Sequence, residues 1–218
     1  MLILGLTGSI AMGKSHAARL FRAMGVPVCD ADALVHDLFR PGGAAVAPVG
    51  AAFPEAIGPE GGVDRPKLAR LVLGDRDALR RLEAIVHPLV RAAQRRFLEV
   101  QCRAGRPIVL LDIPLLFETG AERRVDRVVV VSAHPLLQAQ RALRRPGMTL
   151  AKLAAIRAEQ APETVKLRRA DFVIGSGADR GRTAEAVARI IRSLARERGR
   201  AWPERWLSSE LASKGRSR

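Results

Sequence analysis

A segment of eight residues constrains the fold of this chain more than any other feature of its sequence. Residues 8–15 read Gly-Ser-Ile-Ala-Met-Gly-Lys-Ser and fit the pattern G-x-x-x-x-G-K-[ST]. An apolar run from Leu2 to Leu6 precedes the segment, and apolar residues at helical spacing follow it from Lys14 to Met24. A strand, a glycine-bearing loop and a helix in this order form the context that makes the pattern specific for phosphate. We therefore predict a phosphate-binding loop at residues 8–15.

The residue types in this loop match the chemistry of a nucleoside triphosphate. Successive backbone N–H groups form an anion-binding nest, to which the helix N-terminus adds its positive end. Gly13 permits close approach of the backbone, Lys14 reaches the β- and γ-phosphates, and the Ser15 hydroxyl is placed to ligate Mg²⁺. The alternative is a glycine-rich turn that fits the pattern by chance. We assign to nucleotide binding Gly8, Ala11, Met12, Gly13, Lys14, Ser15 and His16, with Lys14 also catalytic and Ser15 also a metal ligand.

Five short apolar runs predict the strands of one sheet. Helical patterns separate consecutive runs, which predicts a five-stranded parallel sheet covered by helices on both faces, a three-layer α/β fold. The carboxyl ends of the strands then lie at one edge of the sheet, where ligands collect. The predicted strands are Leu2–Leu6, Val26–Cys29, Pro107–Asp112, Arg127–Ser132 and Asp171–Gly175.

The helical patterns divide the chain into a core and two additions. Apolar residues recur at three- and four-residue spacing from Pro66 to about Ala104, with a break near Gly74. Further predicted helices are 14–24, 32–39, 46–52, 135–145, 149–160 and 183–198. We predict a core at residues 1–40, 105–135 and 170–198, a helical insertion at 41–104, a helical lid at 136–169, and a partly disordered basic tail at 199–218.

Carboxylates follow two of the predicted strands. A carboxylate at Asp30 or Asp32 can accept the proton of an attacking hydroxyl, as the base of a kinase does, or it can cap the next helix. His36 lies four residues after Asp32 on the same helical face and, taken alone, fits a surface position. Asp112 ends the third predicted strand and is a candidate water-mediated Mg²⁺ ligand.

Two further segments each admit two interpretations. Large apolar residues at 115–117 either pack under the sheet edge or form the wall of a ligand site. Arg141 and Arg145 lie four residues apart on one helix face. Two short helices joined at Pro146-Gly147 suit a lid that brings arginines onto phosphates, whereas the alternative is a solvated, charged helix pair.

The composition limits the partners of the chain. The 37 Lys and Arg residues against 22 Asp and Glu give a net charge of +15, which suits polyanionic ligands or, alternatively, a solvated basic surface. Aromatic residues make up 4% of the chain and Tyr is absent, so we do not expect a base-stacking nucleic-acid surface. Cys29 and Cys102 cannot by themselves form a disulfide framework or a zinc site, and no apolar stretch is long enough to span a bilayer. We expect a cytoplasmic protein with no membrane partner, and the sequence carries no signal for an oligomeric state.

Several motifs in a fixed order make the chain resemble the dephospho-CoA kinase family over about residues 2 to 195. The most telling are His87-Pro88 with Arg91 in the helical insertion, and the segment Pro114–Glu118. The other matching segments are Gly5–Ser15, Asp30–Asp32 with His36, Val63–Arg65, Gln140-Arg141, Gln160, Lys166 and Ala170–Ile174.

The resemblance implies a P-loop kinase fold with a helical substrate-binding insertion and a helical lid. It also implies ATP-dependent phosphorylation of the ribose 3′-hydroxyl of dephospho-CoA, the last step of coenzyme A synthesis, with Mg²⁺ as cofactor. Asp32 becomes the expected base, Arg141 and Arg145 the lid contacts to ATP, and Asp112 a metal ligand. The residues assigned to the acceptor are Asp32, His36, His87, Arg91, Leu115, Phe117 and Glu118.

The chain departs from the family pattern at two places. Ala11 stands where the family usually has Gly, so a positive φ there is costly. Ala155 stands where a basic residue is common, and Arg157 follows two positions later. Two other functions remain open at this stage: another small-molecule P-loop kinase, such as a nucleoside monophosphate kinase, and a non-catalytic protein that binds nucleic acid through the basic tail.

Overall fold

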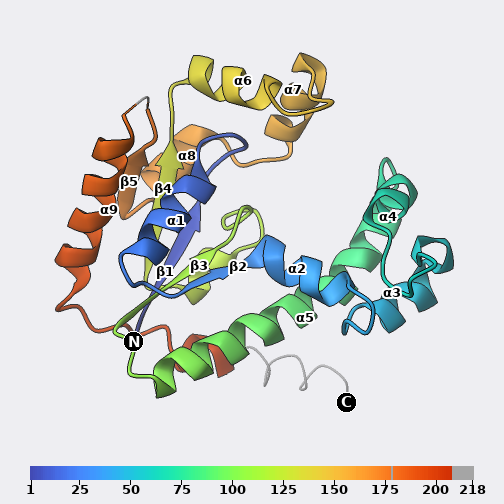
Figure 1. Cartoon of the computed structure of the whole chain (residues 1–218), viewed down its shortest axis with the longest axis horizontal. Helices are drawn as coiled ribbons and strands as arrows, with labels where there is room; N and C mark the ends of the chain where they lie inside the picture. Colours follow the sequence, from blue (N-terminus) through green and yellow to red (C-terminus); the bar gives the residue numbers. More distant parts are fainter. Residues whose placement is uncertain (178, 208–218) are drawn as a thin grey trace. The chain divides into compact units, whose positions relative to one another are not determined.

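The computed structural model describes residues 1–177 and 179–207, and a five-stranded parallel sheet lies at its centre. The strands are β1 (Leu2–Thr7), β2 (Val28–Asp30), β3 (Ile108–Asp112), β4 (Arg127–Ser132) and β5 (Phe172–Gly175). Their order in the sheet is β2-β3-β1-β4-β5 (Figure 1). The predicted strands and the α/β fold are confirmed.

The described residues form two compact units. The sheet unit contains residues 1–29 and the chain from residue 100 onward, and the helical unit contains residues 30–99. The predicted insertion covered residues 41–104, so the structure groups the eleven residues 30–40 with the helices and places residues 100–104 with the sheet unit. The reason for the first difference is that Val35, Leu38 and Phe39 join the hydrophobic cluster of the helical unit.

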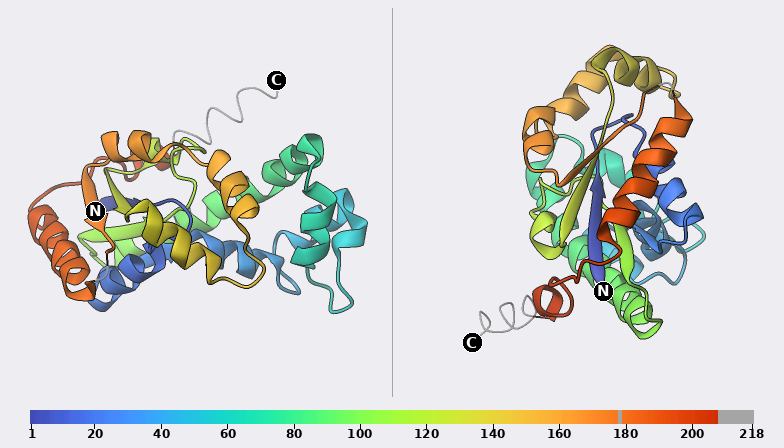
Figure 2. Two further views of the ribbon diagram at one scale, coloured as in Figure 1. Left: turned by 90° about the horizontal axis from the view of Figure 1, so that it is seen from above. Right: turned by 90° about the vertical axis from the view of Figure 1, so that its left-hand side faces the viewer.

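In the sheet unit, alternate residues of β1 face opposite layers. Leu2, Leu4 and Leu6 lie in one core cluster with helices α1 (Lys14–Ala23) and α9 (Arg180–Leu194). These two helices contact each other and therefore cover the same face of the sheet (Figure 2). Each fully buried leucine of this kind contributes about 1.5–3 kcal/mol to the stability of the fold.

The helical unit has its own core. Phe39 and Phe53 are buried there together with Val86 and with apolar residues of four helices. The helices are α2 (Ala31–Phe39), α3 (Val46–Ala52), α4 (Arg65–Val72) and α5 (Arg76–Arg103), with a short 3-10 helix at Pro54–Ala56. Helix α5 continues through Pro88, as the helical pattern of the sequence predicted.

The connection between β4 and β5 carries three helices. These are α6 (Pro135–Leu143), α7 (Leu150–Ala158) and α8 (Glu163–Arg168), of which the sequence predicted the first two. The connection between β3 and β4 contains one further 3-10 helix, Ala121–Arg124. The longest helix, α5, is rich in arginine. Among the described residues, no helix combines the length and the apolar character needed to cross a bilayer.

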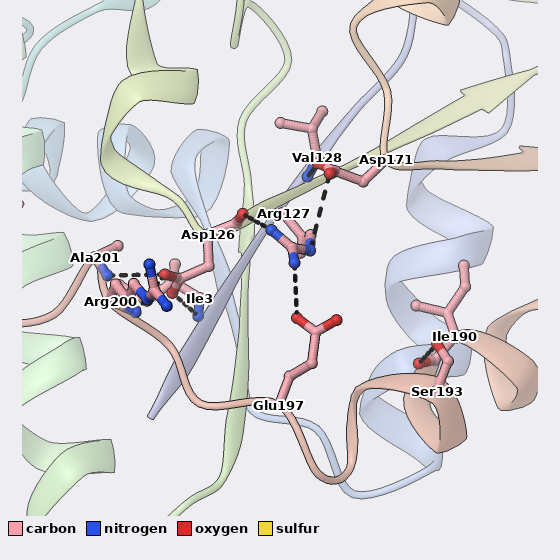
Figure 3. A network of polar contacts seen from close by, with 10 residues as sticks. All are labelled: Ile3, Asp126, Arg127, Val128, Asp171, Ile190, Ser193, Glu197, Arg200 and Ala201. Carbon is pink, nitrogen blue, oxygen red and sulfur yellow. Dashed lines mark hydrogen bonds and ion pairs between the residues drawn. The ribbon is translucent and has the colours of Figure 1, made fainter.

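The predicted basic tail is anchored in its first part. The Asp126 carboxylate, just before β4, accepts hydrogen bonds from the N–H groups of Ile3 at 2.9 Å, Arg200 at 2.6 Å and Ala201 at 2.8 Å (Figure 3). Trp206 is buried and donates its indole N–H to the Arg124 carbonyl at 2.9 Å. Residues 199–207 thus dock on the sheet unit, and the rest of the expected disordered tail, 208–218, lies outside the described residues.

Replacing Asp126 with Asn should weaken this anchor. The variant loses the charge that three backbone N–H groups share, and hydrogen bonds to charged groups contribute about 1.5–3 kcal/mol each to stability. We expect the free energy of unfolding in urea to fall by about 2–3 kcal/mol. The control is Asp77→Asn, which removes an exposed ion pair with Arg80 and should cost less than about 1 kcal/mol. Equal losses in the two variants would contradict the assignment.

Candidate functional site

The loop between β1 and α1 has the backbone of an anion-binding site. Gly13 lies at the N-terminus of α1 with a φ of 91°, and Ala11 has a φ of 60°, both in the left-handed region. In the part of the chain that the structure describes, the N–H groups of Ala11, Gly13, Lys14 and Ser15 donate to no protein acceptor. Four neighbouring donors at a helix N-terminus bind phosphate oxygens well. The φ of Ala11 confirms that this residue carries the steric cost of a left-handed conformation that we expected from the sequence.

Two glycines of the loop leave no room for a side chain. A Cβ at Gly8 would lie 2.6 Å from the carbonyl oxygen of Val131 in β4. A Cβ at Gly13 would lie 2.8 Å from the Ser176 hydroxyl oxygen. The loop is therefore packed against the carboxyl ends of β4 and β5, which fixes its place at the edge of the sheet.

Lys14 and Asp112 form an ion pair at this edge. The Lys14 Nζ and the Asp112 Oδ1 are 2.5 Å apart, and the Asp112 side chain is 2% exposed. An ammonium carries three donors, so Lys14 can hold this carboxylate and still reach a phosphate oxygen. The structure thus brings together two residues that the sequence assigned separately to the nucleotide and to the metal. Ser15, the other predicted metal ligand, is exposed in the first turn of α1.

A buried lysine, Lys166, contacts the side chain of Ser9 in the loop. Lys166 of α8 is fully buried, and its Nζ lies 3.1 Å from the Glu118 Oε1 and 3.3 Å from the Ser9 hydroxyl. Ser9 in turn donates its hydroxyl to the Glu163 Oε2 at 2.9 Å. A buried charge needs such partners, because unpaired burial costs several kcal/mol. This network links the phosphate loop to α8 and to the β3–β4 connection.

Glu118 is held in its charged form. Burial raises the pKa of this carboxyl. Backbone N–H donors, including that of Ala161 at 2.8 Å, and the Lys166 ammonium lower the pKa by more than burial raises it. The pKa of Glu118 therefore lies below its ordinary value of 4.5. The sequence assigned Glu118 to the acceptor, and in the structure its Oε1 is occupied by contacts within the protein.

A cleft of about 750 Å³ lies beside the loop, between α1, α6 and the start of the β5–α9 connection. Three arginines, Arg19, Arg141 and Arg144, line the cleft together with His16, and none of the described residues in the lining is a carboxylate. The Nε2 of His16 is buried without a hydrogen-bond partner in the described structure. The cleft therefore offers positive charge beside Gly13, as a nucleotide site requires.

Arg141 is positioned by the β5–α9 connection. Its guanidinium donates to the Ser176 hydroxyl at 2.9 Å, to the Ser176 carbonyl at 2.7 Å and to the Gly177 carbonyl at 3.1 Å. The Ser176 hydroxyl in turn donates to the Met12 carbonyl in the loop. Arg145, the other predicted nucleotide contact, is exposed and does not line the cleft, where Arg144 stands instead.

The two aspartates after β2 have different roles. Asp30 is the N-cap of α2 and accepts the N–H groups of Asp32 at 2.9 Å and Ala33 at 3.1 Å. The Asp32 carboxylate is exposed and has no partner among the described residues. The structure therefore assigns the capping role to Asp30 and leaves the chemical role of Asp32 a prediction.

The other predicted acceptor residues of the helical unit are exposed. His87 and Arg91 lie four residues apart on one face of α5. His36 lines a cavity of about 400 Å³ within the helical unit, together with Arg40 and Arg65.

Of the apolar residues after β3, some pack in the core and one is exposed. Leu116 is fully buried against Gly5, and Phe117 is buried with the Arg169 guanidinium 4.7 Å from its ring centre. Leu115 is 41% exposed. Packing therefore accounts for Leu116 and Phe117, whereas Leu115 is available to a ligand.

The sequence analysis missed one polar side chain of the loop, Ser9, and three side chains that contact the loop. Ser9, Gln138, Glu163 and Ser176 are polar side chains of ordinary type, and their spacing carries no signal. Gln160 and Lys166 were noted only as parts of the family pattern. Nothing in the sequence shows that Lys166 is buried, because it sits in a six-residue helix that was not predicted.

Comparison with known proteins decides the family. The sequence model described as dephospho-CoA kinase matches residues 2–180. The chain belongs to the dephospho-CoA kinase family. The dephospho-CoA kinase of Mesorhizobium japonicum is 53% identical, over 91% of this chain and 100% of that protein. That of Rhodospirillum rubrum is 53% identical over 92% of this chain and 95% of that protein.

Two solved structures share the fold of this chain. A crystal structure of a Thermus thermophilus protein superposes with a TM-score of 0.73 at 35% identity, over 88% of this chain and 96% of that one. A dephospho-CoA kinase from Campylobacter jejuni gives a TM-score of 0.62 at 21% identity, over 88% of this chain and 96% of that one, which shows the shared fold. The predicted family is confirmed.

Replacing Glu118 with Gln should destabilise the chain in a pH-dependent way. The variant leaves the fully buried Lys166 without its carboxylate, and breaking a buried pair costs about 3–5 kcal/mol. Because the folded-state pKa of Glu118 is lowered, its contribution is complete above the ordinary pKa of 4.5 and is lost as the pH falls through the folded value. Urea unfolding should therefore show a large deficit at neutral pH that shrinks in acid. A deficit that does not change with pH would contradict the charged state of Glu118.

Proposed function

We propose that the chain transfers the γ-phosphoryl group of ATP to the ribose 3′-hydroxyl of dephospho-CoA, which gives coenzyme A. The loop carries the donor half of the proposal, since four backbone N–H groups without a protein acceptor suit a triphosphate. Family membership over residues 2–180 carries the acceptor half.

In this proposal the N–H groups of Ala11, Gly13, Lys14 and Ser15 hold the β- and γ-phosphates of ATP. Lys14 adds a positive charge that neutralises the transferred group, and the Asp112 carboxylate keeps its ammonium at the sheet edge. His16 and Arg141 line the neighbouring cleft and are proposed contacts to the rest of the nucleotide. Arg145 stays a prediction for a moved lid, since it is exposed here.

The residues present fit a magnesium ion bound together with ATP. Mg²⁺ usually takes one or two protein oxygen ligands, completed by phosphates and water. The Ser15 hydroxyl and the Asp112 carboxylate are such ligands, and among the described residues no cluster of three or more His, Cys, Asp or Glu offers a self-sufficient metal cage. When bound, the ion neutralises charge on the phosphates.

Asp32 is the proposed base. Its carboxylate follows β2 directly and is left unused because Asp30 caps the helix. A carboxylate there accepts the proton of the 3′-hydroxyl as the hydroxyl oxygen attacks the γ-phosphorus, while ADP leaves.

The remaining acceptor assignments rest on the family. His36, His87 and Arg91 of the helical unit, together with Leu115, Phe117 and Glu118, are proposed to shape the dephospho-CoA site. Exposure of Leu115 and of His87 is compatible with direct contact, whereas the internal partners of Glu118 suit a supporting role. A cytoplasmic location stays part of the proposal.

Replacing Asp32 with Asn should slow turnover without weakening ATP binding. Removal of a general base lowers the rate by about 10² to 10⁴-fold. The matched control is Asp37→Asn on the same helix, where an exposed pair with Arg40 is lost. We expect near-parental turnover in the control and an unchanged dissociation constant for Mg-ATP in both variants. Phosphorylation of dephospho-CoA by Asp32→Asn at the parental rate would refute the base assignment.

A panel of acceptors with labelled ATP tests the substrate. We expect dephospho-CoA to give the highest kcat/KM, because the chain matches that family over most of its length. Preference for a nucleoside monophosphate would instead select the other small-molecule kinase considered from the sequence.

A further inference from the structure

Glutamine side chains hold both backbone polar groups of Ile10, the residue before Ala11. Gln138 of α6 is buried, and its Nε2 donates to the Ile10 carbonyl at 2.9 Å. Gln160, two residues beyond α7, accepts the Ile10 N–H through its Oε1 at 3.0 Å. Each glutamine presents the end of its amide that the backbone group requires.

Gln138 fixes the direction of a neighbouring donor, whereas Gln160 holds the preceding Ser9–Ile10 peptide and so restrains Ile10 from its other side. The Ile10 carbonyl and the Ala11 N–H belong to one planar trans peptide and point in opposite directions. A carbonyl held by Gln138 therefore determines where the Ala11 N–H points. That N–H is one of the four that donate to no protein acceptor in the described residues.

The same peptide also determines the backbone conformation of Ala11. Its φ of 60° lies in the left-handed region, which residues with a Cβ disfavour and glycine adopts freely. Rotation of the Ile10–Ala11 peptide would carry φ out of this region and turn the N–H away. The strain persists only if the surroundings hold it, and the two glutamines are the side chains that hold Ile10.

We propose that Gln138 and Gln160 are positioning residues that keep the Ile10–Ala11 peptide in the orientation that binds the triphosphate. They supply by hydrogen bonding the geometry that glycine at position 11 would reach without a steric penalty. Neither residue is assigned a contact with ATP. The proposal rests on the proposed function only in that ATP is the ligand of the loop.

The polarity of the two contacts gives a sharp test. Gln160→Glu keeps an oxygen that accepts the Ile10 N–H, whereas Gln138→Glu turns a donor into a group that only accepts and sets it against a carbonyl. Both changes conserve shape and add the same charge on the two sides of Ile10. We expect Gln138→Glu to weaken Mg-ATP binding by about tenfold or more and Gln160→Glu by less than about threefold, as measured by calorimetry.

A second pair of variants carries the test even if Gln138→Glu does not fold. Gln160 is only partly buried, and Gln160→Leu removes the acceptor without adding charge. We expect a loss of about tenfold in Mg-ATP affinity. Ala11→Gly should reduce this loss to less than about threefold, since glycine has no penalty in the left-handed region. A role in packing alone would not respond to Ala11→Gly.

Equal effects of the two Glu variants, or a loss in Gln160→Leu that Ala11→Gly does not reduce, would overturn the proposal. Lowered melting temperatures with unchanged Mg-ATP affinity in all variants would overturn it as well. If the variants show the expected pattern of Mg-ATP affinities but the parent protein does not phosphorylate dephospho-CoA, the proposed function fails and the positioning role stands.

Discussion

In the described part of the chain, the loop after β1 and the first turn of α1 leave four N–H groups without a protein acceptor, and much of the sheet unit maintains that arrangement. Gly13, Lys14 and Ser15 stand at the helix N-terminus, where N–H groups have no intrahelical acceptor. The left-handed Ala11 beside them persists only where the surrounding structure holds it. Close packing of Gly8 on β4 excludes a shift toward the sheet. Side chains from α6, from the β5–α9 connection and from α8 hold residues 9–12 from the other directions.

The buried polar network against the loop pairs its ammonium but not all of its oxygens, since the Glu118 Oε2 and the Glu163 Oε1 are buried without a hydrogen-bond partner in the described structure. Lys166 is fully buried, and an ammonium in that position is tolerated only with a carboxylate and further acceptors. Glu118 and Ser9 supply these partners. Glu163 in turn accepts a hydrogen bond from the Ser9 hydroxyl. Because every member depends on the next, loss of one partner leaves a buried charge or donor, so the network specifies one loop position rather than several.

The parts of this architecture that follow from local pattern could be predicted from the sequence. The phosphate loop is a contiguous motif, and the apolar runs of β1 and β3 identify buried strands without reference to the rest of the chain. Contacts between distant residues could not be predicted in this way. Gln138 lies 128 residues from Ile10, and Ser176 lies 164 residues from Met12. The two possible roles of Asp30 and Asp32 were also inseparable until α2 showed which residue begins the helix.

The distribution of charge around the loop separates attraction from chemistry. Lys14 is neutralised by Asp112 at 2.5 Å, so this pair adds little long-range attraction for ATP. In the proposed function the attraction comes from the neighbouring cleft, where no carboxylate of the described residues lies in the lining beside Arg19, Arg141 and Arg144. Arg141 donates to a hydroxyl and two carbonyls, which position the guanidinium without neutralising its charge. On this proposal the cleft draws the polyanion in, whereas Lys14 acts only at short range, once a phosphate oxygen competes with Asp112 for its protons.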